Sequence, residues 1–149
     1  KALVRVLKKE GVTLVGDGTE NHLLLLDLVK TNGAGSGVLV QDALGVAGIT
    51  VNKNTIPSEP SSPFYPSGIR LGTPALTSRG MKEKEMEKIG KWICEVIKVT
   101  STYALPEIKE ERPEFVRNAR KDFEKNKVLL KINSEVKKLC KKFPVPGVK

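Results

Sequence analysis

The run His22-Leu-Leu-Leu-Leu-Asp-Leu-Val29 decides the fold, because it is the densest apolar stretch of the chain. It has the length of one strand and is apolar at nearly every position, which predicts a buried β-strand. Just upstream, Val12-Thr-Leu-Val15 predicts a second, shorter strand. Turn-forming residues, Gly16-Asp-Gly-Thr-Glu-Asn21, separate the two. This spacing predicts an antiparallel pair.

Helical periodicity lies on both sides of these strands. Lys1–Glu10 predicts the later part of an amphipathic helix, and Met81–Val99 predicts a long one. Glu83 and Glu85 lie in the first turn of the long helix, where their negative charges interact favourably with the helix dipole. Its apolar stripe is Met86, Ile89, Trp92, Ile93, Val96 and Ile97. A last helical region, ended by Pro144 and Pro146, has the stripe Val128, Ile132, Val136, Leu139, Cys140 and Phe143.

The middle of the chain predicts shorter elements. Four prolines in residues 52–68 argue against a helix or a central strand there and favour an ordered loop suited to binding. The other expected segments are a flexible loop over 31–37, a short helix over 38–47, extended chain over 49–51, a strand over 69–72 and a break over 101–114. Together these elements predict an α+β two-layer sandwich, with a small, mainly antiparallel sheet of about three strands covered by helices.

Length and charge narrow the class of protein. The 149 residues suffice for one domain with its own core. No stretch approaches the roughly 20 apolar residues of a membrane helix, so we expect no membrane partner. The net charge of +9, from 26 Lys and Arg against 17 Asp and Glu, is compatible with nucleic-acid binding. However, acids interleave with bases, as in Lys82-Glu-Lys-Glu85, which favours solvated helix faces and no nucleic-acid partner.

The cysteines and the first residue bear on cellular context. Cys94 and Cys140 each fall in a helical apolar stripe, which favours free thiols in a cytoplasmic protein over a disulfide. The chain begins at Lys1, within a helical pattern, and we therefore expect it to be part of a longer protein.

Few residues carry recognisable chemistry. Gly33-Ala-Gly-Ser-Gly37 lacks the strand, helix and acid of a dinucleotide-binding loop. His22 and two separated cysteines lack zinc-ligand spacing, so we expect no metal site. His22 fits a hydrogen-bonded structural role, or a place beside a cleft. Arg70, among apolar and small neighbours, fits binding of a carboxylate or phosphate by its planar guanidinium, and fits a surface ion pair with an acid such as Asp27 equally well.

Several further motifs occur in a definite order and spacing. The upstream motif is Gly18-Thr-Glu-Asn-His-Leu-x-Leu-x-Asp-Leu28. The others are Val51-Asn-Lys-Asn-Thr-Ile-Pro57, Ser62-Pro-Phe64, Ser67-Gly-Ile-Arg-Leu-Gly-Thr-Pro-Ala75 and Thr77-x-Arg-Gly80. Together these motifs resemble the serine hydroxymethyltransferase family. The resemblance covers residues 1–100, and Lys142-Phe-Pro144 resembles the C-terminus of the family more loosely. Residues 101–127 are longer than is usual in the family.

The resemblance implies a fold-type-I pyridoxal phosphate enzyme, a homodimer or larger, that interconverts serine and glycine and passes the one-carbon unit to tetrahydrofolate. It implies that Arg70 binds the carboxylate of the amino-acid substrate, because a bidentate fork fixes the orientation of the α-carbon. It also implies that Asn54 contacts the folate, with Ser61, Ser62, Pro63 and Phe64 lying along it.

The family's Schiff-base lysine, which lies in a Thr-rich segment ending His-Lys, does not occur in this sequence. We therefore expect residues 1–149 to be the C-terminal domain of such an enzyme, with part of the substrate site but inactive alone. The alternative is a stand-alone, non-catalytic binding module that keeps the fold.

Overall fold

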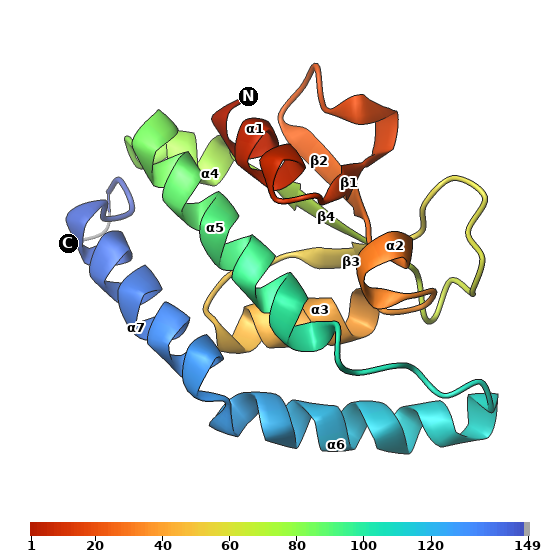
Figure 1. Cartoon of the computed structure of the whole chain (residues 1–149). Coiled ribbons are helices and arrows are strands. Elements are labelled where there is room, and N and C mark those ends of the chain that lie inside the picture. Colours follow the sequence, from red (N-terminus) through yellow and green to blue (C-terminus); the bar gives the residue numbers. More distant parts are fainter. Residues whose placement is uncertain (148–149) are drawn as a thin grey trace.

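A four-stranded antiparallel sheet forms the centre of the computed structural model, which describes residues 1–147 (Figure 1). The strands lie in the order β1-β2-β4-β3. Their bounds are Thr13–Leu14 for β1, Leu23–Asp27 for β2, Asn52–Asn54 for β3 and Gly68–Gly72 for β4. The antiparallel pairing of β1 with β2 is confirmed, and the sheet has one strand more than the sequence predicted.

The two faces of the sheet differ in what covers them. Leu24 pairs with Leu71 and Leu26 with Ile69, and all four side chains are buried against the helices. The alternate residues of β2 leave the opposite face, where Leu23 is 40% exposed. The prediction that the whole run from His22 to Val29 is buried is therefore wrong. Every second residue faces outward, although two of these outward residues, Leu23 and Leu25, are also leucines.

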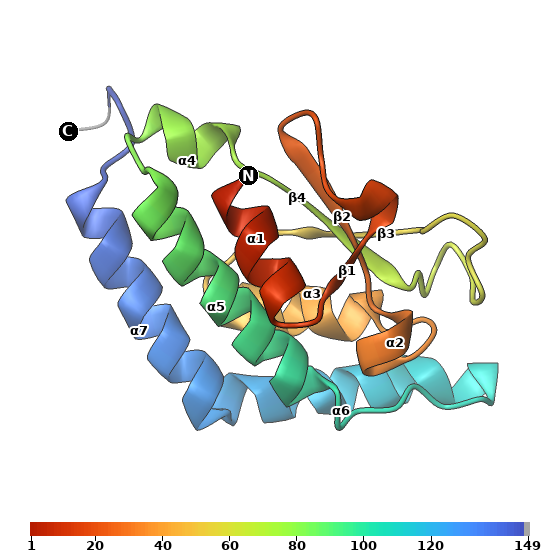
Figure 2. The same ribbon diagram turned by 45° about the horizontal axis from the view of Figure 1, so that its top comes forward.

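Helices cover only one face of this sheet (Figures 1 and 2). Next to it, α1 (Ala2–Lys9) packs on α5 (Glu83–Thr100), and α5 packs on α3 (Gly37–Val46). An outer pair, α6 (Arg112–Lys125) and α7 (Lys127–Lys142), packs against α3. The α+β two-layer sandwich is confirmed, with α6 and α7 added outside the helical layer.

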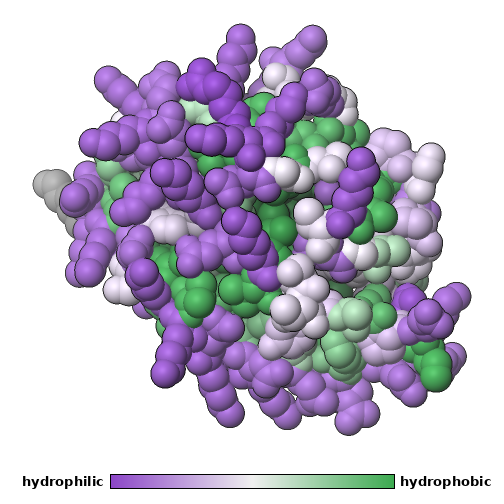
Figure 3. Space-filling view, viewed as in Figure 1, coloured by the Kyte–Doolittle hydropathy of each residue, from purple (hydrophilic) through white to green (hydrophobic). Residues whose placement is uncertain are grey.

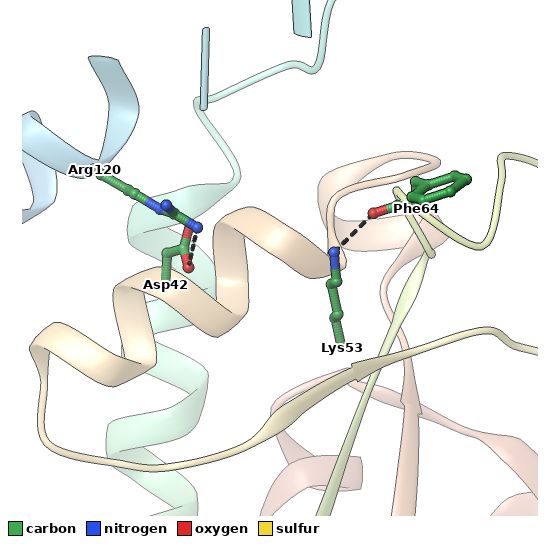
Figure 4. A network of polar contacts seen from close by, with 4 residues as sticks. All are labelled: Asp42, Lys53, Phe64 and Arg120. Carbon is green, nitrogen blue, oxygen red and sulfur yellow. Dashed lines mark hydrogen bonds and ion pairs between the residues drawn. The ribbon is translucent and has the colours of Figure 1, made fainter. Parts of the chain in front are cut away.

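One core joins these layers. Phe123 of α6 and Leu129 of α7 are fully buried, as are Leu26 and Ile69 of the sheet. Arg120 on α6 also bonds Asp42 on α3 through two nitrogen–oxygen contacts of 2.5 and 3.2 Å (Figure 4). Hydrophilic side chains dominate the outer surface over α6 and α7 (Figure 3).

The sequence analysis did not predict four short elements. They are α2 (Val29–Asn32), α4 (Pro74–Ser78) and the 3-10 turns η1 (Val15–Asp17) and η2 (Lys109–Glu111). In α4, Pro74 occupies the first helical position, where its missing N–H costs nothing. Pro113 lies likewise in the first turn of α6, so this helix begins at Arg112, inside the break predicted for residues 101–114.

The strand β3 lies inside the proline-rich stretch, where the sequence predicted no central strand. It is an edge strand, and the Gln41 side chain of α3 accepts a hydrogen bond from the backbone N–H of Lys53 at 2.7 Å. This contact occupies a backbone donor that an edge strand would otherwise expose.

The predicted thiols and helices agree with the structure. Cys94 is buried and Cys140 partly buried, and neither forms a disulfide. Burial and the nearby Glu10 raise the pKa of the Cys94 thiol to about 11, so it is an inert core residue.

Trp92 is buried in α5, and its Nε1–H donates to Glu135 of α7 at 3.0 Å. Within residues 1–147, no helix is both long enough and apolar enough to span a membrane.

Candidate functional site

The face of the sheet that the helices leave open holds the candidate site. Arg70 lies on the central strand β4, between Leu25 of β2 and Asn52 of β3, and its side chain projects from this open face. Arg70 is exposed, and its guanidinium makes no hydrogen bond or ion pair with residues 1–147. A concave surface of about 630 Å³, lined by Arg70 and the loop from Val15 to Asn21, lies beside it.

The pair with Asp27, which the sequence left open, does not form. Asp27 lies opposite Gly68 and not opposite Arg70, and its Oδ1 accepts the backbone N–H of Val29 at 2.9 Å. The carboxylate therefore caps the turn into α2. Arg70 keeps all five of its N–H donors available to a ligand.

Asn54 lies on the same open face as Arg70. It pairs with Gly68, two residues before Arg70 on β4. Side chains in this diagonal relationship on neighbouring strands have Cα atoms about 7–8 Å apart. The Nδ2 of Asn54 donates to the carbonyl of Thr55 at 2.7 Å, which holds the amide at the point where β3 becomes a loop.

The loop between β3 and β4 carries the other four predicted residues. It projects from the sheet on the far side from α7 (Figure 1). Ser61 and Ser62 are half-buried, Pro63 is exposed and Phe64 is 80% exposed. A large apolar ring so open to solvent, at the tip of an ordered loop, is suited to stacking on a flat ligand.

Two contacts hold the tip of this loop in place. The ammonium group of Lys53 donates to the carbonyl of Phe64 at 2.9 Å (Figure 4). The Arg112 guanidinium lies 5.5 Å from the centre of the Tyr65 ring. The second contact comes from the start of α6, next to the long segment whose role the sequence did not predict.

The base of the loop is held by Glu59, which sequence reasoning missed. Its carboxylate accepts hydrogen bonds from the backbone N–H groups of Ile56, Ser61 and Ser67 and from the Ser67 hydroxyl. Burial opposes ionisation of Glu59, but these hydrogen bonds outweigh that effect and lower the pKa of its carboxyl. Glu59 is therefore charged at neutral pH. Its four donors come from three separated positions, which no local motif indicates.

The glycine-rich run after α2 packs against the same loop. The N–H of Gly35 donates to the Ser67 hydroxyl at 2.9 Å, and Gly35 has φ of +79°. A Cβ on Gly37 would lie 2.5 Å from the carbonyl oxygens of Pro66 and Gly68. The glycines thus permit close approach of two backbones, and the flexible loop predicted for residues 31–37 is wrong. It is a helical turn followed by a tightly packed connection.

Two further residues are set apart from the site. His22 is exposed and its side chain makes no hydrogen bond with residues 1–147, so a hydrogen-bonded structural role is wrong. Arg79, in the Thr77-x-Arg-Gly80 motif, donates to the carbonyls of Phe143 and Cys140 at 2.6 and 3.1 Å. It stabilises the C-terminus of α7 through carbonyls that the helix leaves unpaired.

The comparisons with known proteins point to one family. The family model for serine hydroxymethyltransferase matches residues 1–93. A serine hydroxymethyltransferase of Methanospirillum hungatei is 54% identical over 112 residues, which cover 74% of this chain and 27% of the relative. One of Coxiella burnetii is 40% identical over 145 residues, covering 97% of this chain and 29% of the relative. The chain thus spans less than a third of these relatives, and it belongs to the serine hydroxymethyltransferase family.

Proposed function

We propose that residues 1–149 are the C-terminal domain of a serine hydroxymethyltransferase, and that this domain holds the amino-acid substrate and the folate from one side. In the full-length enzyme, serine plus tetrahydrofolate would be interconverted with glycine plus methylene-tetrahydrofolate. The observation that carries the proposal is the exposed guanidinium of Arg70 on the open face, which has no partner among residues 1–147 and lies in the same row of the sheet as Asn52.

Arg70 would bind the substrate carboxylate through two parallel N–H···O bonds. A fork held by a central strand fixes both the position and the plane of the carboxylate, and hence the direction of the bonds at the α-carbon. Asp27 accepts the Val29 N–H, and no carboxylate among residues 1–147 forms an ion pair with the Arg70 guanidinium. The substrate can therefore form this ion pair without displacing an internal one.

Asn54 and the loop would bind tetrahydrofolate. The Asn54 amide offers a donor and an acceptor suited to the edge of a pterin ring. Ser61 and Ser62 add polar groups, and Pro63 and Phe64 add an exposed apolar surface. The same side of the domain would thus present a carboxylate site and a folate site side by side.

Pyridoxal phosphate, held mainly by the rest of the enzyme, would act as the electron sink for cleavage at the α-carbon. The donor set of this chain fits the substrate side of such a site. Lys53, the lysine nearest in sequence to Asn54, is engaged by the Phe64 carbonyl. By family membership, we also propose a cytoplasmic homodimer or larger assembly, with no nucleic-acid or membrane partner.

A chimaera tests this proposal directly. The matching 27% of the Methanospirillum hungatei protein is replaced by this chain, and cleavage of serine is measured with and without tetrahydrofolate. We expect tetrahydrofolate-dependent cleavage in the chimaera, and its loss when Arg70 is replaced by lysine. A folded chimaera that binds folate but does not cleave serine would instead support the non-catalytic binding module.

A further inference from the structure

Glu59 holds the loop of residues 55–67 from the inside. Its Oε1 accepts from the Ser61 N–H at 3.1 Å and from the Ser67 hydroxyl, and its Oε2 accepts from the N–H groups of Ile56 and Ser67 at 3.2 and 3.0 Å. A carboxylate has about four acceptor sites, so this arrangement uses all of them. The bonds join the start, the middle and the end of the loop to one charged group.

The backbone around Glu59 is shaped for this role. Ser58 has φ of +55°, one of only two positive values at non-glycine residues among 1–147. Such a conformation is unfavourable for a serine and persists where the surroundings impose it. The left-handed turn at Ser58 immediately precedes Glu59, whose carboxylate lies inside the loop. Hydrogen bonds from three N–H groups and one hydroxyl to a carboxylate offset the cost.

The bonds of Glu59 connect the folate residues to the fixed part of the fold. Ser67 directly precedes β4, its carbonyl accepts from the N–H of Leu28 at 3.0 Å, and its hydroxyl accepts from Gly35. Through Glu59, this fixed residue is linked to Ser61, the first of the four predicted folate residues that lie in the loop. The position of Arg70 depends less on Glu59, because β2 and β3 hold β4 on both sides.

We propose that Glu59 is a positioning residue for tetrahydrofolate, which acts by fixing Ser61 to Phe64 without touching either substrate. The inference rests on the proposed function, since it concerns the same folate site. It predicts that folate and the amino-acid substrates respond differently to a change at Glu59. Loss of the Glu59 charge should weaken the use of folate and leave the binding of amino acids nearly unchanged.

Glu59→Gln is the sharpest test, because it keeps the shape and changes one acceptor into a donor. The best orientation of the glutamine amide keeps its oxygen on Ile56 and Ser67 and turns its nitrogen toward the Ser67 hydroxyl, which can accept. The N–H of Ser61 then faces another N–H donor and loses its partner. Amide hydrogen exchange at Ser61 should accelerate more than at Ile56 or Ser67.

The kinetic measurement is made on the full-length protein. We expect about a tenfold higher KM for tetrahydrofolate in Glu59→Gln, the order of effect that follows from losing one hydrogen bond to a charged group. The KM for serine and the affinity for glycine should change less than about twofold. Glu87→Gln is the matched control, because Glu87 is exposed on α5 and makes no side-chain hydrogen bond or ion pair with residues 1–147.

The outcomes separate this inference from the proposed function. If the wild-type protein binds no tetrahydrofolate, the proposed function fails and the role of Glu59 falls with it. If the wild type binds folate and folded Glu59→Gln binds it equally well, only the role of Glu59 is wrong. Equal rises in the KM for serine and for tetrahydrofolate would show general loosening of the domain, and would also overturn the inference.

Discussion

Arg70 and Asn54 leave the same face of the sheet from neighbouring strands, with Arg70 opposite Asn52 and Asn54 two residues farther along β3. Two hydrogen-bonded strands therefore fix the spacing of the proposed carboxylate and folate sites. The loop of residues 55–67 begins directly after Asn54 and ends directly before Gly68, so the same pair of strands holds both of its ends. A change at either site should consequently affect one substrate more than the other.

Arg70→Lys in the full-length enzyme should be far from conservative. Lysine supplies a point charge and cannot form the two parallel bonds of a guanidinium to a carboxylate. Loss of a charge-assisted pair costs roughly 2–5 kcal/mol, or about 30- to several-thousand-fold in affinity. Serine affinity and turnover should both fall, as measured by steady-state kinetics and glycine binding. Arg117→Lys, at an exposed position of α6, is the control, and normal serine turnover in Arg70→Lys would refute the assignment.

Asn54→Ala should impair folate use selectively. The substitution removes the amide from the open face, and no other strand residue depends on that amide, because its Nδ2 bonds only the adjacent Thr55 carbonyl. We expect a higher KM for tetrahydrofolate and an unchanged affinity for glycine, measured by spectroscopic titration. Asn118→Ala, at an exposed position on α6, serves as the control. A fall in glycine affinity equal to the fall in folate affinity would show that Asn54 supports the sheet instead.

How much of this site could be predicted depends on the range of the interactions. Arg70 and Asn54 are predicted as site residues because they lie in contiguous motifs. The elements β4 and α5 are predicted because their apolar residues repeat at the period of the element. The sequence could not predict that Arg70 forms no ion pair with Asp27. That outcome depends on the pairing of β2 with β4, which places Asp27 opposite Gly68.

The residues that hold the site were missed for a related reason. Glu59 binds donors from Ile56 to Ser67, and Arg112 reaches Tyr65 from a helix far along the chain. Neither contact has a periodic or local signature. The short helices α2 and α4 were missed as well, because four or five residues are too few to show a helical period.

Glu59 should make stability depend on pH in the acid range. Its pKa is lowered in the folded state, so the folded state binds fewer protons at this carboxyl than the unfolded state does. The contribution of Glu59 to the free energy of unfolding is therefore fully present above the ordinary glutamate pKa of about 4.3. It is lost as the pH falls through the lowered pKa of the folded state. Denaturation from pH 7 to pH 3 should show a smaller decrease in stability for Glu59→Gln than for the wild type. Parallel curves for the two proteins would contradict this.

The chain alone should be catalytically inactive and should form no specific covalent adduct with pyridoxal phosphate. The motivation is that its sequence contains no His-Lys segment, and that Lys53, next to the site, is bound to the Phe64 carbonyl. Borohydride reduction followed by peptide mass spectrometry should find only substoichiometric labelling spread over surface lysines. One lysine labelled stoichiometrically, together with cleavage of serine, would overturn the expectation.

The chain should nevertheless fold without the rest of the enzyme. Its core residues come from both ends of the sequence, with Leu7 of α1, Leu26 of β2, Phe123 of α6 and Leu129 of α7 all fully buried. Elements that depend on one another in this way unfold cooperatively. Trp92, the single tryptophan, lies on α5 and donates a hydrogen bond to Glu135 of α7, so it is the natural probe.

Urea denaturation followed by Trp92 fluorescence should give blue-shifted emission in the native state and one transition, coincident with the loss of helical circular dichroism. Leu23 and Phe64, 40% and 80% exposed, would be left uncovered on the isolated chain, so self-association at high concentration is also expected. Replacing Leu23 by serine on this open face should reduce association without shifting the transition by more than a small amount, because Leu23 contributes little to the core. A broad, non-cooperative transition would mean that the core of this chain is not complete on its own.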